Sequence, residues 1–259
     1  MHVLRILTRM AEMKAHDVKN MPAPRSVFQR RLERLQYQIR HPFRFRRLKK
    51  QCSEHRCIFV HIPKCAGTSI RQSLFGTAGG HRTLAGYQTM LPPELFAECF
   101  KFTFVRNPWD RLASAFFFLK NGDMTSNHKW AKNNLSTLEN FDAFVRQWVT
   151  RENVWSYSHF RPQFQFICLE GKQPAVDFIG FYENLVPDFS MICERIKSPA
   201  KLREENRNAR RTKDYRDCYT DETRRIVTEV YAEDIELFGY SFDNSSLPTQ
   251  IAARNHARS

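Results

Sequence analysis

The sequence predicts an α/β fold in which a mostly parallel central sheet is flanked by helices. Three apolar runs, 57–62, 101–105 and 177–182, have the length and composition of buried strands. Helix-forming segments separate these runs, so successive strands need crossover connections and are expected to pair in parallel. With 259 residues, of which 42% are hydrophobic, the chain is long enough to form one sizeable domain.

The predicted helices follow from apolar periodicity and from residues that start or stop a helix. In chain order they cover 26–38, 68–75, 92–99, 110–119, 141–150, 185–196 and 221–238. The last is the clearest, because Thr220 or Asp221 can cap its start and Gly239 ends it. The first ends before His41-Pro42, since the residue before a proline avoids the helical region. Segment 121–155 is otherwise polar and broken.

Basic residues dominate the charge of the chain. The formal net charge is +14, which predicts attraction to polyanions, and the excess is concentrated in 25–50 and 201–216. We therefore divide the chain into a basic N-terminal appendage, 1–50, a main domain, 51–243, and a C-terminal tail, 244–259. Seven cysteines without C-x-x-C spacing support neither a zinc site nor a disulfide framework.

The most informative segment joins the first predicted strand to the helix that follows it. The strand ends at Pro63-Lys64, and a helix begins close to Gly67. A helix start offers unpaired backbone N–H groups and the positive end of the helix dipole, which together favour a bound phosphate. The sequence therefore predicts a phosphate loop formed by Pro63, Lys64, Cys65, Ala66, Gly67, Thr68 and Ser69.

The order of residues in this loop differs from that of a nucleoside triphosphate loop. In the usual pattern a lysine follows the last glycine, whereas Lys64 precedes Gly67. The second predicted strand runs into Arg106-Asn107-Pro108 rather than into an acidic residue that could hold magnesium. We therefore expect a single 5′-phosphate with a group attached to it, and no metal.

Segments 63–69 and 105–116 closely resemble the two signature segments of sulfotransferases that use 3′-phosphoadenosine 5′-phosphosulfate (PAPS). The first resembles the 5′-phosphosulfate loop. The second resembles the 3′-phosphate element, in which an arginine and a serine eight positions later bind the phosphate, as Arg106 and Ser114 are spaced here. The resemblance is closest to carbohydrate sulfotransferases of the chondroitin, dermatan and uronyl 2-O type and their bacterial relatives, and it covers residues 55–243.

The resemblance implies the P-loop-like nucleotide-binding fold of sulfotransferases. It also implies transfer of a sulfuryl group from PAPS, as co-substrate, to a hydroxyl group of a carbohydrate or glycan acceptor. We expect Lys64 to act in catalysis at the oxygen that bridges phosphate and sulfate, where negative charge grows as the bond breaks. Arg106 and Ser114 are expected to hold the 3′-phosphate, since an arginine fork matches two phosphate oxygens.

A histidine is the natural general base for the incoming hydroxyl, because its pKa lies near neutrality. His81 is the first candidate, because a histidine proposed as the base in related uronyl 2-O-sulfotransferases lies in the corresponding interval. His159 is the second candidate, or it orients the acceptor sugar instead. His61 is expected to support the loop, and Glu183 and Asp110 remain further candidates for the base.

Several residues allow two interpretations. Arg111 could join the phosphate shell or form an ion pair on a helix surface, and Cys65 could be reactive or a bystander. Trp109 and Trp155 could stack on a base or a sugar, or be buried in the core. A basic run in 203–220 could close over the donor or remain a solvated charge run; its members are Arg203, Arg207, Arg210, Arg211 and Lys213.

Two other function classes remain open. A magnesium-dependent kinase or nucleotide hydrolase would share the fold, and a nucleic-acid-binding protein would explain the charge but not the two phosphate segments. The absence of a long apolar segment or a signal-like N-terminus favours a cytoplasmic protein, whose basic arm could contact an anionic membrane. A Golgi-lumenal location would apply if an anchor had been removed. The sequence leaves the oligomeric state open.

Overall fold

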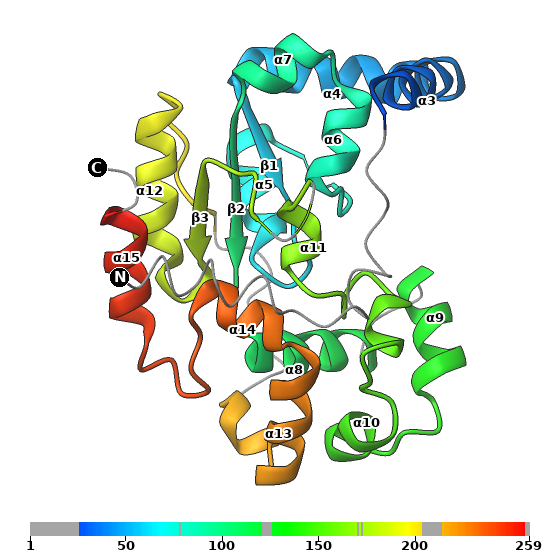
Figure 1. The fold of residues 1–259 in the computed structure, drawn as a ribbon, viewed down its shortest axis with the longest axis vertical. Helices are drawn as coiled ribbons and strands as arrows, with labels where there is room; N and C mark the ends of the chain where they lie inside the picture. Colours follow the sequence, from blue (N-terminus) through cyan, green and yellow to red (C-terminus); the bar gives the residue numbers. More distant parts are fainter. Residues whose placement is uncertain are drawn as a thin grey trace.

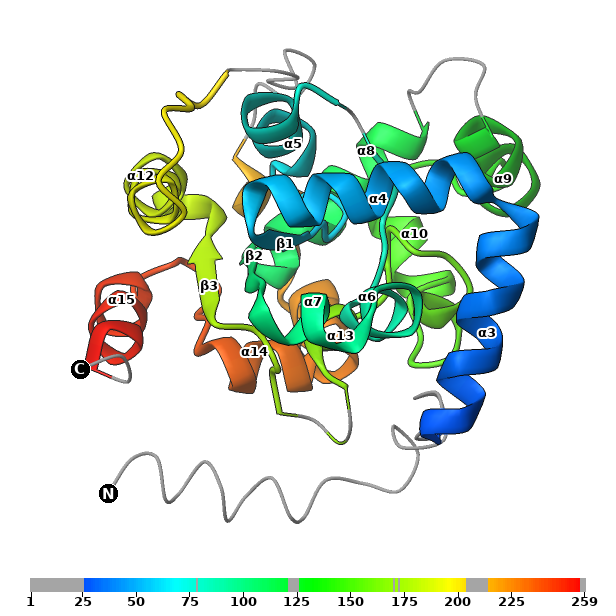
Figure 2. The ribbon, with the colours of Figure 1, turned by 90° about the horizontal axis from the view of Figure 1, so that it is seen from above.

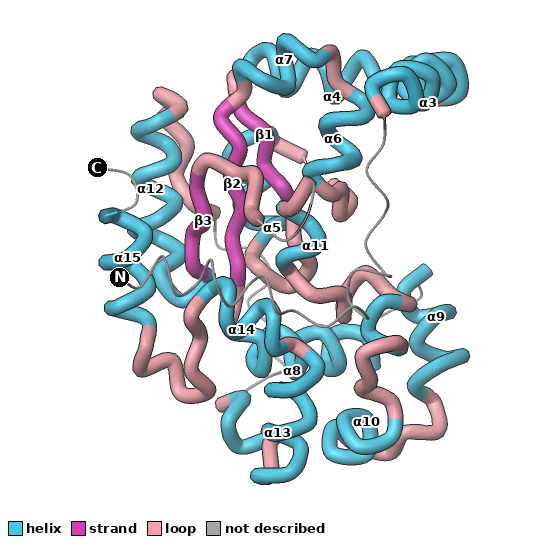
Figure 3. Tube along the Cα trace, viewed as in Figure 1, coloured by secondary structure: helices cyan, strands magenta, loops and turns pink. Residues whose placement is uncertain are grey.

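Three parallel strands form the centre of the molecule (Figure 1 and Figure 3). The computed structural model describes residues 26–77, 79–120, 126–169, 171, 173–203 and 214–256. Strands β1 (Cys57–Val60), β2 (Phe100–Val105) and β3 (Phe178–Phe181) pair in the order β1-β2-β3. Cys57 lies opposite Phe100 in the register of the first pair. The predicted α/β fold with a parallel, helix-flanked sheet is confirmed.

Helices cover both faces of this sheet. Seen along the strands, α4 (Pro42–His55), α5 (Gly67–Phe75) and α12 (Leu185–Arg195) lie on one side, and α6 (Leu84–Met90) and α7 (Pro93–Glu98) on the other (Figure 2). Helix α3 (Val27–Arg40) packs against α6. This arrangement buries both faces of the strands, as is usual for parallel sheets.

The carboxyl ends of the strands point towards a second group of helices (Figure 1). The longest of them is α8 (Pro108–Lys120), which follows β2 directly, because Pro108 is well suited to the first turn of a helix. The others are α9 (Ser126–Leu135), α10 (Phe141–Gln147), α11 (Phe164–Ile167), α13 (Asp221–Val230) and α14 (Ala232–Phe238). Short 3-10 turns occupy Asn153–Trp155, Tyr182–Asn184 and Tyr215–Cys218, and α15 (Leu247–His256) ends the described chain.

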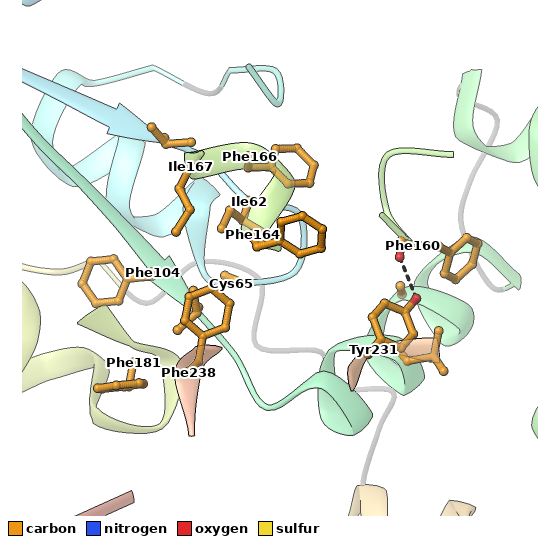
Figure 4. Close-up of a cluster of buried hydrophobic side chains, with 14 of the residues drawn as sticks. Ile62, Cys65, Phe104, Phe160, Phe164, Phe166, Ile167, Phe181, Tyr231 and Phe238 are labelled. Atoms are coloured by element: carbon orange, nitrogen blue, oxygen red, sulfur yellow. Dashed lines mark hydrogen bonds between the residues drawn. The ribbon is translucent and has the colours of Figure 1, made fainter. Parts of the chain in front are cut away.

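One continuous apolar core joins the sheet to these helices. Figure 4 shows part of it, including Cys65, Phe104 and Phe238. Tyr231 is 1% exposed, and its hydroxyl donates a 2.6 Å hydrogen bond to the carbonyl oxygen of Phe160. The long helix predicted over 221–238 is wrong in one respect: it breaks at Tyr231, whose backbone leaves the helical conformation between α13 and α14.

Several elements were not predicted. Helices α4, α6, α9 and α15 have polar or mixed sequences, and tertiary contacts stabilise them; α4, for instance, packs against β1 and buries Cys52. The division at residues 50 and 243 stays a prediction, although α4 crosses the first boundary. No helix among the described residues combines the length and the apolar content that a membrane span requires.

Candidate active site

The loop between β1 and α5 has an unusual backbone. Lys64 and Ala66 both adopt positive φ, of 68° and 58°, which is strained for residues with a side chain and is typical of functional loops. Gly67 starts α5, and a Cβ there would lie 1.8 Å from Cδ2 of His61. Because Ala66 offers no capping side chain, the first N–H groups of α5 depend on other acceptors. The loop thus has the backbone geometry of an anion cradle.

Lys64 is held in an environment that weakens its hold on a proton. Its Nζ lies 3.9 Å from the centre of the Phe118 ring, a cation–π contact. Burial, followed by the nearby charge of Arg106, lowers the pKa of the amine to about 8. A cation in such a place gains from any bound anion, because the anion would offset both effects.

Arg106 connects the second signature segment to the phosphate loop. Its guanidinium donates a 3.0 Å hydrogen bond from Nη1 to the carbonyl oxygen of Lys64, although the two residues are far apart in sequence. The Nε donates to Oδ2 of Asp110 at 2.7 Å, and the guanidinium carbon lies 3.9 Å from the centre of the Tyr182 ring. Arg106 is 9% exposed, so these contacts fix its orientation towards the loop.

Ser114 lies on the face of α8 that links these two cations. Residues four apart share a helix face, so Asp110, Ser114 and Phe118 form one row. The row begins at Asp110, which accepts the hydrogen bond from Arg106. It ends at Phe118, whose ring contacts Lys64. Ser114 is 3% exposed and stands between them. The structure thus brings the predicted phosphate-loop residues, Arg106 and Ser114 to one edge of the sheet.

The side chain of Gln163 holds the two segments together, a role that the sequence did not suggest. Its Oε1 accepts a 2.9 Å hydrogen bond from the backbone N–H of Arg106 and a 3.4 Å bond from the thiol of Cys65. Its Nε2 donates to the carbonyl oxygen of Arg106 at 2.9 Å. Asp234 in turn accepts from the backbone N–H groups of Gln163 and Phe164, at 2.7 and 2.9 Å.

Replacing Gln163 with leucine is expected to lower the free energy of unfolding by about 3 kcal/mol, because two buried backbone groups of Arg106 lose their partner. Gln165→Leu, two residues further on in α11, is the matched control, since Oε1 of Gln165 has no hydrogen-bond partner among the described residues. Urea unfolding followed by tryptophan fluorescence measures both variants. Equal losses in the two variants would contradict a specific role for Gln163.

Three histidines meet beside the phosphate loop. The ring centres of His61 and His81 are 4.3 Å apart, and those of His81 and His159 are 5.3 Å apart. His159 is also stacked between Phe118 and Tyr157, with ring centres 5.5 and 5.3 Å away. Since Phe118 carries the Lys64 contact, the histidines and the lysine belong to one cluster.

The hydrogen bonding of His81 determines its tautomer. Its Nδ1 lies 3.2 Å from the carbonyl oxygen of His61. A carbonyl oxygen only accepts, so Nδ1 carries the proton and Nε2 keeps the lone pair that a general base needs. Burial, and then the charges of Lys64 and Arg111, lower the pKa of His81. The hydrogen bond to His61 opposes this shift without cancelling it, so the neutral ring is favoured at pH 7.

His159 has a different environment. It is 6% exposed, and burial together with the nearby His81 and Lys64 lowers its pKa to about 3. Its Nδ1 finds no hydrogen-bond partner among the described residues. The low pKa makes the His159 ring a weaker base than His81, and its burial limits contact with solvent.

Other candidates have structural partners. Glu183 accepts from the backbone N–H of Asn107 at 2.7 Å and from the Tyr240 hydroxyl at 2.9 Å. Burial raises the pKa of the Cys65 thiol to about 12, which disfavours the reactive thiolate form. Arg111 was expected either in the phosphate shell or in an ion pair on a helix surface, and the structure gives it other partners. It is 1% exposed and donates to the carbonyl oxygens of His159, Phe160 and Arg161.

Both candidate tryptophans belong to the core, whereas most of the basic run lies outside the described residues. Trp109 is buried in the core, and its indole N–H donates to the carbonyl oxygen of Arg224 at 3.3 Å. Trp155 is partly buried against the same core. In the basic run, Arg203 is exposed, whereas Arg207, Arg210, Arg211 and Lys213 lie outside the described residues.

Comparison with known proteins identifies the family of the chain. Residues 50–241 match the Sulfotransferase family, a span that includes both phosphate segments and all three histidines. The chain belongs to the sulfotransferase family. The predicted resemblance to sulfotransferases is confirmed at the level of the family.

Two relatives show how far the sulfotransferase similarity extends. Carbohydrate sulfotransferase 14 of Danio rerio is 27% identical over 235 residues, which cover 74% of this chain and 62% of that relative. An uncharacterized protein of Archaeoglobus fulgidus is 29% identical over 109 residues, covering 42% of this chain and 77% of that protein. The chain thus spans less than two thirds of the length of the first relative. No solved structure gives a significant match.

Proposed function

We propose that this sulfotransferase moves the sulfuryl group of PAPS to a hydroxyl group of a carbohydrate. The observation that carries the proposal is the hydrogen bond between the Arg106 guanidinium and the backbone of Lys64. It makes the two signature segments neighbours, so one adenosine carrier can reach both with phosphates at its two ends. Two cations, Lys64 and Arg106, and the partial positive charge at the start of α5 would then face the same ligand.

In this proposal the phosphate loop binds and activates the donor. The backbone N–H groups at the start of α5 and the hydroxyl groups of Thr68 and Ser69 would hold the 5′-phosphate. The Lys64 amine would neutralise the charge that grows on the bridging oxygen as the sulfur–oxygen bond breaks. Because the loop is fixed in advance by Gly67 and His61, its donors need little rearrangement during the reaction.

His81 would accept the proton of the acceptor hydroxyl at Nε2. The acceptor oxygen then forms its bond to sulfur while the bridging sulfur–oxygen bond breaks, leaving adenosine 3′,5′-bisphosphate. The bond from Nδ1 to the carbonyl oxygen of His61 would orient the ring and stabilise the imidazolium that forms. His159 would hold the other side of His81 by ring contact, and it would line the path of the acceptor.

The proposal also names the acceptor, a carbohydrate. It is supported by the similarity to a carbohydrate sulfotransferase and by the resemblance of the two segments. A direct test incubates the protein with PAPS labelled at sulfur and with a panel of glycans that differ in uronic acid and hexosamine content. Labelled glycan supports the proposal. Label released only as free sulfate, or transferred only to a phenol or an amine, contradicts the carbohydrate assignment.

Ser114→Ala should lower the affinity for adenosine 3′,5′-bisphosphate about tenfold, since one hydrogen bond to a charged group is lost. The affinity for adenosine 5′-monophosphate, which lacks the 3′-phosphate, should not change. Calorimetric titration with both ligands gives the ratio, and Ser190→Ala on the exposed side of α12 is the control. An equal loss for both ligands would contradict the assignment of Ser114 to the 3′-phosphate.

A further inference from the structure

Helix α3 carries a row of apolar side chains that no described part of the protein covers. Phe28, Leu32, Leu35 and Ile39 follow each other at intervals of four, three and four residues, so they lie on one face of the helix. Their exposed fractions are 75%, 47%, 49% and 79%, and those of the flanking Val27 and Phe43 are 75% and 82%. These six residues form the apolar face of this region.

The apolar face points away from the body of the protein. Arg34 donates a 3.1 Å hydrogen bond to the carbonyl oxygen of Thr89 on α6, and Tyr37 lies beside the guanidinium of Arg82. At about 100° per residue, Tyr37 is on the opposite side of the helix from Phe28. The contacts that hold α3 in place thus use one side and leave the apolar face to the outside.

Basic residues surround the apolar face. Residues 26–50 contain nine arginines and lysines against a single acid, Glu33. Seven of the basic side chains are exposed: Arg31, Arg40, Arg44, Arg46, Arg47, Lys49 and Lys50. They belong to α3 and α4, which share a short connection at His41 and contact each other (Figure 2). An apolar stripe with a cationic margin is the pattern of a helix that lies in a membrane interface.

We propose that α3 and the start of α4 dock this protein on an anionic lipid surface. The apolar face would enter the boundary between head groups and acyl chains, and the surrounding arginines and lysines would contact the negative head groups. Both helices have 14 residues, so they would lie on the bilayer rather than cross it.

Charge complementarity favours this occupant over the alternatives. A second copy of the chain would cover the apolar face but would bring two strongly basic surfaces together. A nucleic acid would neutralise the basic residues but would leave the leucine and isoleucine side chains without a partner. An anionic bilayer would cover the apolar face with acyl chains and pair the surrounding basic residues with its head groups. The surface lies outside residues 50–241, so it is separate from the features that define the family.

The proposal is tested by sedimentation of the full chain with vesicles. One set contains phosphatidylcholine only, and the other contains phosphatidylcholine mixed with phosphatidylglycerol. We expect at least about tenfold stronger binding to the anionic vesicles. The triple variant Leu32→Ser, Leu35→Ser, Ile39→Ser should lose this binding. The matched control is Val186→Ser with Met191→Ser, two exposed apolar residues of α12, and it should bind like the unchanged protein.

Three outcomes would overturn the proposal. Binding that survives the triple variant would show that charge alone holds the protein to lipid. Equal binding to both kinds of vesicle would contradict a role for the basic margin. A dimer in solution that the triple variant dissociates, without vesicle binding, would assign the face to a second copy. Circular dichroism and the rate of sulfate transfer to a soluble acceptor check that the triple variant is folded and intact at the site.

Discussion

His81→Gln should lower the rate of sulfate transfer by about 10²–10⁴-fold, the usual contribution of a positioned general base. The affinity for adenosine 3′,5′-bisphosphate should not change, since His81 contacts the histidine cluster rather than the phosphate loop. Glutamine keeps a polar side chain of similar length and removes the imidazole with its basic Nε2. Turnover at saturating donor, combined with calorimetry, separates the two effects.

His159→Asn provides the comparison for this variant. If His159 only supports the ring of His81 and the path of the acceptor, its loss should raise the KM for acceptor more than it lowers kcat. In the unchanged enzyme the rate should fall at low pH as His81 becomes protonated, and this limb should disappear in His81→Gln. Full activity in His81→Gln with complete loss in His159→Asn would move the role of base to His159.

Lys64→Met should lower kcat by about 10²–10³-fold, the size of effect produced by removing one preorganised group that stabilises transition-state charge. Methionine fills a similar volume and keeps the contact with the Phe118 ring. The loss should therefore come from the charge and not from packing. Single-turnover rates at saturating donor measure it, and Lys50→Met on the exposed surface of α4 is the control. An unchanged kcat in Lys64→Met would contradict a role in the chemical step.

The pKa of Lys64 adds a pH dependence with a definite sign. The amine is charged below its pKa of about 8, so affinity for the anionic bisphosphate should fall as the pH rises through that value. In Lys64→Met the affinity should be flat over the same range.

The same pKa changes the stability of the ligand-free protein. Between pH 8 and the ordinary lysine pKa of 10.5, the unfolded chain binds more protons at this position than the folded one. The contribution of Lys64 to the free energy of unfolding therefore rises with pH in that window. Lys64→Met should lack this rise, which denaturation curves at several pH values can measure.

The phosphate loop was predictable because its signal is local. An apolar run, a proline and a lysine, and then a glycine before hydroxyl residues specify a strand, a turn and a helix start within a short segment. The same holds for Arg106 and Ser114, whose spacing places the serine one turn beyond Asp110 on α8. In both cases the structure has the predicted element types, with boundaries that differ by one or two residues.

The contacts that join these segments could not be predicted, because they depend on residues far apart in the chain. Gln163 reaches Arg106 and Cys65 from the residue before α11, and Tyr182 reaches Arg106 from the end of β3. His61, His81 and His159 could be considered one at a time, but no pattern in the sequence shows that their rings touch. Likewise, the sequence does not show that the helix is interrupted at Tyr231, whose hydroxyl contacts the distant carbonyl oxygen of Phe160.

The central claim is that the loop at Lys64 and the guanidinium of Arg106 hold opposite ends of one adenosine bisphosphate carrier. Calorimetric titration of the unchanged protein and of Arg106→Ala, with adenosine 3′,5′-bisphosphate and separately with ATP and magnesium, tests it most directly. We expect the unchanged protein to bind the bisphosphate in preference to ATP, and Arg106→Ala to remain folded but lose that preference. Binding of ATP with magnesium and none of the bisphosphate would contradict the account and favour a kinase or nucleotide hydrolase.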